Sequence, residues 1–131
     1  MKLRILGSLF VFSIYSACST QTESSIEVSY ANFEAAYRAN PKIHVLDVRT
    51  PQEYQEGHVP GAVLLPLQDI EAKGRSVSLP FAKEDQIYVI CRSGRRSVTA
   101  AKILQEAGYN KSISVQGGTL AWIKNGNSVE R

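Results

Sequence analysis

Two short runs of almost continuous apolar residues place the strongest constraint on the fold of this chain. Residues 43–46 read IHVL and residues 87–90 read IYVI, and both runs are rich in β-branched and aromatic side chains. Strands that are apolar on both faces belong in the interior of a parallel sheet, because helices cover both of its faces. We therefore expect both runs to form central strands.

Further β-rich segments alternate with helical segments along the rest of the chain. Strands are predicted at residues 26–29, 43–47, 62–65, 87–90 and 112–115, and helices at residues 31–39, directly after residue 50, at residues 97–107 and near residues 119–125. This alternation implies parallel strands joined by crossover helices. The predicted fold is α/β, an open five-stranded parallel sheet with helices on both faces. A chain of 131 residues has room for one such domain.

The clearest local signal is a helix start at Thr50. Thr50-Pro51-Gln52-Glu53 has the pattern of a capping box, with Thr50 as the N-cap and Glu53 bonding back to it. Gly57 is placed to end this helix after a few residues.

Residues 1–17 have the form of a secretory signal. Lys2 and Arg4 precede an uncharged, mostly apolar stretch at residues 5–17. This stretch is shorter than the roughly 20 residues that a membrane-spanning helix needs. We expect export of the protein, with residues 18–25 as a tether and residues 26–127 as the folded domain.

The end of this signal contains the first of two cysteines. Residues 14–19 resemble the lipobox of bacterial lipoproteins, with Cys18 as the lipid attachment site and Tyr15 as a departure from the usual aliphatic residue. Ordinary cleavage after Ser19 is the alternative. The prediction is a periplasmic or cell-envelope lipoprotein of a bacterium, which touches the membrane only through its lipid.

Charge and cysteine content exclude several classes of partner. The formal charge is +3, and without Lys2 and Arg4 it falls to +1, so a nucleic-acid partner has no support from composition. Two cysteines are too few for a disulfide scaffold or a tetrahedral zinc site. The sequence shows no glycine-rich nucleotide loop and no metal-ligand cluster. We expect no cofactor and no metal.

The second cysteine follows the central strand at residues 87–90 and opens the segment CRSGRRS at residues 91–97, here named the Cys91 loop. Functional groups of open parallel sheets gather where strands end and helices begin. Backbone N–H groups, a helix N-terminus and three guanidinium groups all favour thiolate over thiol. Cys91 is therefore the candidate nucleophile, although a lone cysteine after a strand is more often a small buried residue.

Three motifs together resemble the rhodanese-like sulfurtransferase family. The Cys91 loop resembles the family's active-site loop, residues 46–54 with residues 57–62 resemble its N-terminal signature, and residues 117–122 resemble its C-terminal one. They occur in the family's order and cover nearly everything from residue 26 to residue 127.

The resemblance implies a monomeric rhodanese domain that moves sulfane sulfur through a persulfide on Cys91. The donor would be a small anion such as thiosulfate, and the acceptor would be cyanide or a thiol. Arg96 matches the arginine of the family's Cys-x-x-Gly-x-Arg pattern and ranks first for donor binding, followed by Arg92.

Other residues are expected to support this site. Arg95, Ser93 and Gly94 would complete the donor-binding loop. Asp47 and Arg49 follow the neighbouring strand, where the Asp47 carboxylate would pair with an arginine of the Cys91 loop. The alternative for Asp47 is a helix cap or a surface ion pair.

Two other functions remain open. A non-catalytic binding module or a sulfur carrier for a partner protein would use the same fold. Phosphatases and arsenate reductases of this fold carry an arginine six positions after the cysteine, where this chain has Ser97. That mismatch favours sulfur transfer over phosphoryl chemistry.

Overall fold

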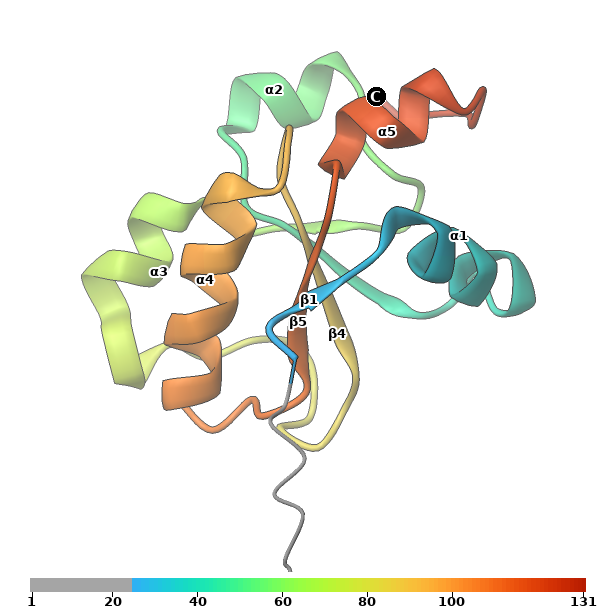
Figure 1. Cartoon of the computed structure of the whole chain (residues 1–131). Coiled ribbons are helices and arrows are strands. Elements are labelled where there is room, and N and C mark those ends of the chain that lie inside the picture. The colour runs from blue at the N-terminus through green and yellow to red at the C-terminus, as the bar shows by residue number, and fades with distance from the viewer. Residues whose placement is uncertain (1–24) are drawn as a thin grey trace, which may run out of the picture.

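The computed structural model describes residues 25–131, which form a five-stranded, all-parallel sheet in the order β1-β5-β4-β2-β3 (Figure 1). The strands are β1 (Glu27–Val28), β2 (His44–Asp47), β3 (Val63–Leu64), β4 (Ile87–Ile90) and β5 (Ser112–Val115). All five predicted strands are present, and the two apolar runs, β2 and β4, lie inside the sheet. The predicted signal, Cys18 and the tether up to residue 24 lie outside the described residues.

The helices are α1 (Tyr30–Ala39), α2 (Pro51–Glu56), α3 (Leu67–Lys73), α4 (Arg95–Glu106) and α5 (Gly118–Lys124), and a 3-10 turn at Gly74–Ser76 follows α3. Thr50 accepts from the N–H of Glu53, whose side chain bonds back to the Thr50 N–H, so the predicted capping box is confirmed. Helix α4 begins at Arg95, two residues before the predicted start. Helix α3 is a helix that the sequence analysis missed. No helix within residues 25–131 is long and apolar enough to cross a membrane.

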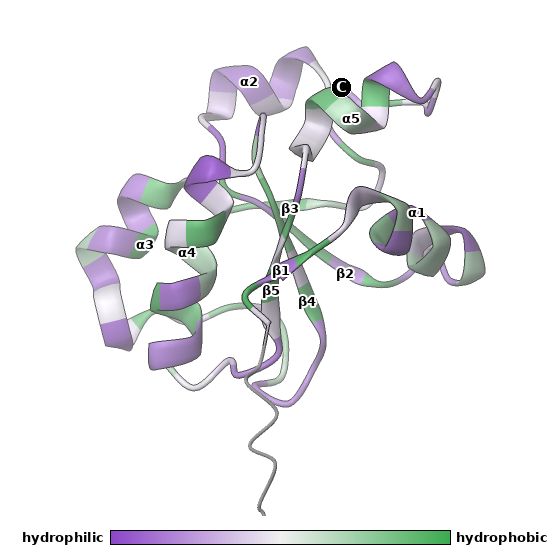
Figure 2. Ribbon diagram, in the orientation of Figure 1, coloured by the Kyte–Doolittle hydropathy of each residue, from purple (hydrophilic) through white to green (hydrophobic). Residues whose placement is uncertain are grey.

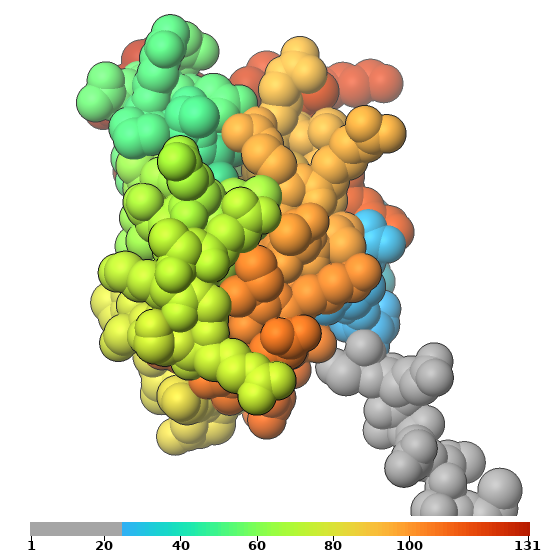
Figure 3. Space-filling view, turned by 90° about the vertical axis from the view of Figure 1, so that its left-hand side faces the viewer, coloured from blue at the N-terminus to red at the C-terminus, as the bar shows by residue number. Residues whose placement is uncertain are grey.

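The core lies on both sides of the sheet (Figure 2). Neighbouring strand residues point to opposite faces, so Leu46 joins the core beneath α3 and α4, whereas Val45 joins the core beneath α1 and α5. In the turned view of Figure 3, α3 and α4 lie side by side over one face. Helices on both faces, as predicted, explain why β2 and β4 are apolar throughout.

One of these two cores is organised around aromatic rings. Phe33 of α1 is fully buried, and its ring centroid lies 5.3 Å from that of Tyr88, 6.0 Å from that of Trp122 and 6.2 Å from that of Tyr37. Tilted aromatic contacts at these distances add to the free energy gained by burial. Phe33 therefore joins α1 to the sheet and to α5.

We predict that Phe33→Ala lowers the free energy of unfolding by about 3–4 kcal/mol, because it leaves a cavity between three rings. Urea denaturation would measure the change. Lys102→Ala, at an exposed position of α4, is the control and should stay within about 0.5 kcal/mol of wild type. A loss below about 1 kcal/mol for Phe33→Ala would contradict the aromatic core described above.

Candidate active site

The register of the sheet brings the two predicted functional strand ends together. Asp47 is the register partner of Ile90, and the N–H of Val48 donates to the Ile90 carbonyl at 2.9 Å. The Cys91 loop and the Asp47 turn therefore leave the same edge of the sheet side by side. This is the carboxyl edge, at which parallel sheets place their sites.

The Cys91 loop folds around the sulfur of its own cysteine. Gly94 adopts φ +105°, a left-handed conformation that favours glycine, and forms the N-cap of α4. Its N–H donates to Cys91 Sγ at 3.1 Å. Cys91 is only 1% exposed, so its surroundings cover the side chain almost completely.

Helix α5 holds the outside of the same loop. The Thr119 N–H donates to the Cys91 carbonyl at 2.8 Å, the Thr119 hydroxyl donates to the same oxygen at 3.0 Å, and the Leu120 N–H donates to the Arg92 carbonyl at 3.1 Å. These bonds keep both carbonyls turned toward α5. The N–H of Ser93, which shares a peptide group with the Arg92 carbonyl, is thereby turned toward the sulfur.

The environment of Cys91 favours its thiolate. Burial raises the pKa of the thiol, but hydrogen bonds from the Ser97 hydroxyl and from the backbone N–H groups of Ser97, Gly94 and Ser93 outweigh burial. The net effect is a pKa below the ordinary value for cysteine. The sequence predicts such a nucleophile at this position.

Arg96 makes a contact that the sequence analysis did not foresee. Its Nη1 and Nη2 donate to the two carboxylate oxygens of Glu53, each at 2.8 Å. The same carboxylate accepts the N–H of Thr50 at 3.0 Å, so Glu53 joins the capping box of α2 to the first turn of α4. Hydrogen bonds from Arg96, followed by those from Thr50, outweigh burial and lower the pKa of Glu53 to about 2.

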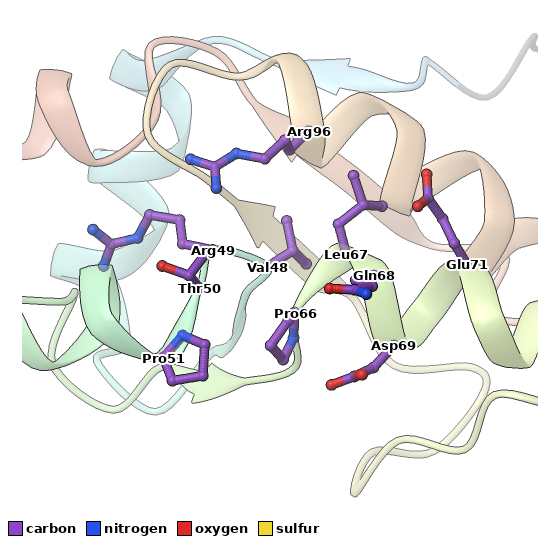
Figure 4. A pocket seen from close by; sticks show the side chains of 10 residues that line it. All are labelled: Val48, Arg49, Thr50, Pro51, Pro66, Leu67, Gln68, Asp69, Glu71 and Arg96. Carbon is purple, nitrogen blue, oxygen red and sulfur yellow. The ribbon is translucent and has the colours of Figure 1, made fainter.

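A hollow of about 440 Å³ lies beside this ion pair, between the β2–α2 turn and α3. Figure 4 shows Arg96 extending across the hollow from α4, above Val48 and Leu67. Its charge is matched by Glu53, so the hollow does not present a free guanidinium.

Arg92 and Arg95 are exposed and lie on either side of the Cys91 loop. Within residues 25–131 neither side chain makes a hydrogen bond or an ion pair. Arg92 lines a second hollow of about 400 Å³ between α2 and α5, and Arg95 lines another beside Gly117. The unpaired positive charge of the loop therefore comes from these two residues.

Asp47 does not pair with an arginine of the Cys91 loop, and this expectation was wrong. Its carboxylate accepts Arg49 Nη2 at 2.7 Å, and the same nitrogen donates to the Gly57 carbonyl at 2.8 Å. Asp47 is fully buried and Arg49 nearly so. The short spacing lets Arg49 fold back onto Asp47, and the pair fastens the end of β2 to the end of α2.

Three further contributors to the site escaped the sequence analysis. Ser97 was assigned to the loop without a role, Ser114 was only part of a predicted strand, and Thr119 only the start of a predicted helix. Their partners are 6, 17 and 28 residues away in the chain. Within the described part of the chain, no group of three or more His, Cys, Asp or Glu residues could hold a metal ion.

Residues 31–125 match the rhodanese-like domain family. The chain belongs to this family. The predicted family and its fold are thereby confirmed. A solved structure of a rhodanese-related protein from Thermoplasma volcanium is 28% identical and superimposes with a TM-score of 0.65 over 79% of this chain and 96% of that one.

Two relatives have names that refer to sulfur chemistry. The putative sulfur carrier protein YrkF of Bacillus subtilis is 36% identical over 105 residues, which are 79% of this chain and 55% of that protein. This chain thus spans little more than half the length of that relative. Thiosulfate sulfurtransferase 16 of Arabidopsis thaliana is 42% identical over 62% of this chain and 74% of that protein. These similarities support a rhodanese-type sulfur transfer.

We predict that Gly118→Ala disrupts the Cys91 loop. Gly118 has φ +56°, and an added Cβ would lie 2.3 Å from the Cys91 carbonyl oxygen and 2.6 Å from that of Arg92. The clash and the strained backbone should lower the free energy of unfolding by about 3 kcal/mol or more. Urea denaturation and sulfur transfer would both be measured.

The control for this variant is Gly126→Ala, because Gly126 has φ +78° and open space around its Cα. It carries the conformational strain without the clash, so we expect a loss of about 1–2 kcal/mol and normal sulfur transfer. Equal effects of the two variants would show that the contact between Gly118 and the loop is unimportant.

We predict that the stabilising effect of Glu53 depends on pH. Its pKa is about 2 in the folded protein against an ordinary 4.5, so its contribution is complete above about pH 4.5 and is lost as the pH falls toward 2. Glu53→Gln should lower the free energy of unfolding by about 1 kcal/mol at pH 7, since the pair is partly exposed.

Urea denaturation at pH 7 and pH 3 would test this prediction, because the difference between wild type and Glu53→Gln should be smaller at pH 3. Glu84→Gln is the control: this carboxylate is exposed and forms no ion pair within the described residues. A difference for Glu53→Gln that is the same at both pH values would exclude the charged pair as its source.

Proposed function

We propose that the protein transfers sulfane sulfur from a small anionic donor such as thiosulfate to a nucleophilic acceptor, through a persulfide on Cys91. The observation that carries this proposal is the position of Cys91 Sγ, which accepts the Gly94 N–H at 3.1 Å and belongs to a thiol whose pKa is lowered. A thiolate among fixed donors is a ready nucleophile.

The reaction has two displacement steps. The Cys91 thiolate attacks the outer sulfur of thiosulfate, the S–S bond of the donor breaks, and its electron pair leaves with sulfite. The outer sulfur remains on Cys91 as a persulfide anion. Cyanide or a thiolate then attacks that sulfur, which gives thiocyanate or a new persulfide and returns the Cys91 thiolate.

The loop supplies the groups that these steps need. The N–H groups of Ser93 and Gly94 stabilise negative charge on the sulfur, as oxyanion holes do for oxygen. Arg92 and Arg95 hold the sulfonate oxygens of the donor and stabilise the departing sulfite, because their charges are unpaired. Arg96, paired with Glu53, holds the loop in place.

A protein thiol is a second candidate acceptor. Leu120 and Ile123 are the exposed large hydrophobic residues of the described chain, 45% and 54% exposed, and both line the hollow that Arg92 also lines. An apolar surface beside the Cys91 loop suits a protein partner better than cyanide. The relative named as a putative sulfur carrier is consistent with such an acceptor.

We predict that incubation with thiosulfate adds the mass of one sulfur atom to the protein and that this product releases thiocyanate with cyanide. Cys91→Ser should abolish both, since its hydroxyl cannot form a persulfide. Intact mass spectrometry and thiocyanate release are the measurements. Full activity of Cys91→Ser would exclude the proposed function.

Arginine variants test donor binding in the same assay. Arg92→Ala should raise the KM for thiosulfate about tenfold, the loss expected for one charge-assisted hydrogen bond. Arg75→Ala is matched in charge loss, and its residue lies in the 3-10 turn beyond α3. An unchanged KM in Arg92→Ala would remove Arg92 from the donor site.

A further inference from the structure

Two buried serine hydroxyls lie behind the sulfur of Cys91. Cys91 Sγ is 3.4 Å from the hydroxyl oxygen of Ser97, which is 2.7 Å from that of Ser114, which in turn is 3.4 Å from the Gly94 carbonyl oxygen. Ser97 belongs to the first turn of α4 and Ser114 to β5, and both are fully buried. These contacts form a continuous series of hydrogen bonds from the sulfur to a carbonyl oxygen, here named the hydroxyl chain.

The two ends of the hydroxyl chain, the sulfur and the Gly94 carbonyl, determine which way its hydrogens point when Cys91 is a thiol. A carbonyl oxygen only accepts hydrogen bonds, and each hydroxyl has one hydrogen to donate. The thiol therefore donates to Ser97, Ser97 donates to Ser114, and Ser114 donates to Gly94. Every hydrogen in the chain has an acceptor.

The direction reverses when the thiol loses its proton. A thiolate only accepts, so the Ser97 hydroxyl turns its hydrogen toward Cys91 Sγ. The Ser97 oxygen is then free to accept from Ser114, at the short distance of 2.7 Å. Only the long contact to Gly94 is lost, and no heavy atom has to move.

We propose that Ser97 and Ser114 are positioning residues that stabilise the Cys91 thiolate by reversing their hydroxyl groups when the thiol ionises. The proton itself leaves to water, and the hydroxyls carry no net proton. This inference rests on the proposed function, because it concerns the nucleophile of that reaction. The Ser97 hydroxyl is then a further donor to the sulfur, from the protein interior, besides the N–H groups of the loop.

Burial of a serine does not by itself indicate such a role. Ser112 lies two residues before Ser114 on the same strand and is equally buried, yet its hydroxyl has no hydrogen-bond partner. Ser97 and Ser114 differ from it by their connection to the sulfur. Ser112 is therefore a matched control, within the same protein, for the effect of losing a buried hydroxyl.

The charges around the sulfur stay the same in serine variants. The charged side chains of the Cys91 loop, the end of β2 and the first turn of α2 are Arg92, Arg95, Arg96, Asp47, Arg49 and Glu53. A serine substitution changes none of them. Strand β5 and the first turn of α5 carry no ionisable side chain. A difference in thiol ionisation between serine variants therefore reports on the hydroxyls.

The test is the pKa of Cys91, measured as the pH dependence of alkylation by iodoacetamide and followed by intact mass. The protein is the full chain with Cys18→Ser, which leaves Cys91 as the one thiol. Ser97→Ala should raise the pKa by roughly one unit, a tenfold fall in thiolate at a fixed pH below it. Circular dichroism would check that each variant is folded.

Ser114→Ala should raise the pKa by a smaller amount. It removes the acceptor of the Ser97 hydroxyl when Cys91 is a thiol and the donor to Ser97 when Cys91 is a thiolate, and the hydrogen bond that supports the charged group is the stronger of the two. In the Ser97→Ala background, Ser114→Ala should have no further effect, because the link to the sulfur is already missing. Ser112→Ala should leave the pKa unchanged.

Three results would overturn the inference: an unchanged pKa in Ser97→Ala, equal shifts in Ser112→Ala and Ser114→Ala, or additive shifts in the double variant. Alkylation needs no sulfur donor, so these outcomes are independent of the proposed function. A protein that shows the expected shifts but takes no sulfur from thiosulfate would retain the hydroxyl chain and lose the proposed reaction.

Discussion

The site depends on the hydrogen bonds between the start of α5 and the two carbonyls that follow β4. A peptide group is planar, so turning the Cys91 and Arg92 carbonyls toward α5 turns the N–H groups of the next residues the other way. The Ser93 N–H is thereby turned toward the sulfur, and it and the Gly94 N–H need no rearrangement when negative charge develops there. Gly118 is required for this contact, since any side chain there would collide with both carbonyls.

Two ion pairs fix the surroundings of that loop rather than taking part in it. The pair of Asp47 and Arg49 is buried and fastens β2 to the end of α2, while the pair of Glu53 and Arg96 joins α2 to α4. The buried pair of Asp47 and Arg49 contributes little net stability, although removing one partner would cost much. The partly exposed pair of Glu53 and Arg96 contributes about 1 kcal/mol. Both pairs fix the geometry around the loop, and Arg92 and Arg95 remain unpaired within the described residues.

Local patterns in the sequence predicted most of the fold, whereas contacts between distant segments were beyond their reach. The capping box and the two apolar runs depend on neighbouring residues, and they were found where expected. Helix α3 was missed because it is short and its N-cap, Pro66, makes no side-chain hydrogen bond. Glu53 already had a role in the capping box, so nothing in its surroundings indicated a second partner 43 residues away. Arg96 was ranked first for donor binding because it matches the family's Cys-x-x-Gly-x-Arg pattern, and that pattern does not show its pairing with Glu53.

The position of α5 after the Cys91 loop in the sequence also bears on how the nucleophile forms. Cys91 is synthesised well before Thr119 and Leu120, whose N–H groups hold its loop. β5, which completes the serine pair behind the sulfur, is likewise made after the cysteine. A chain that has not yet reached Leu120 lacks these contacts, so we expect its thiol to be less activated than that of the folded protein. We therefore expect the order of synthesis to limit premature reaction of the cysteine.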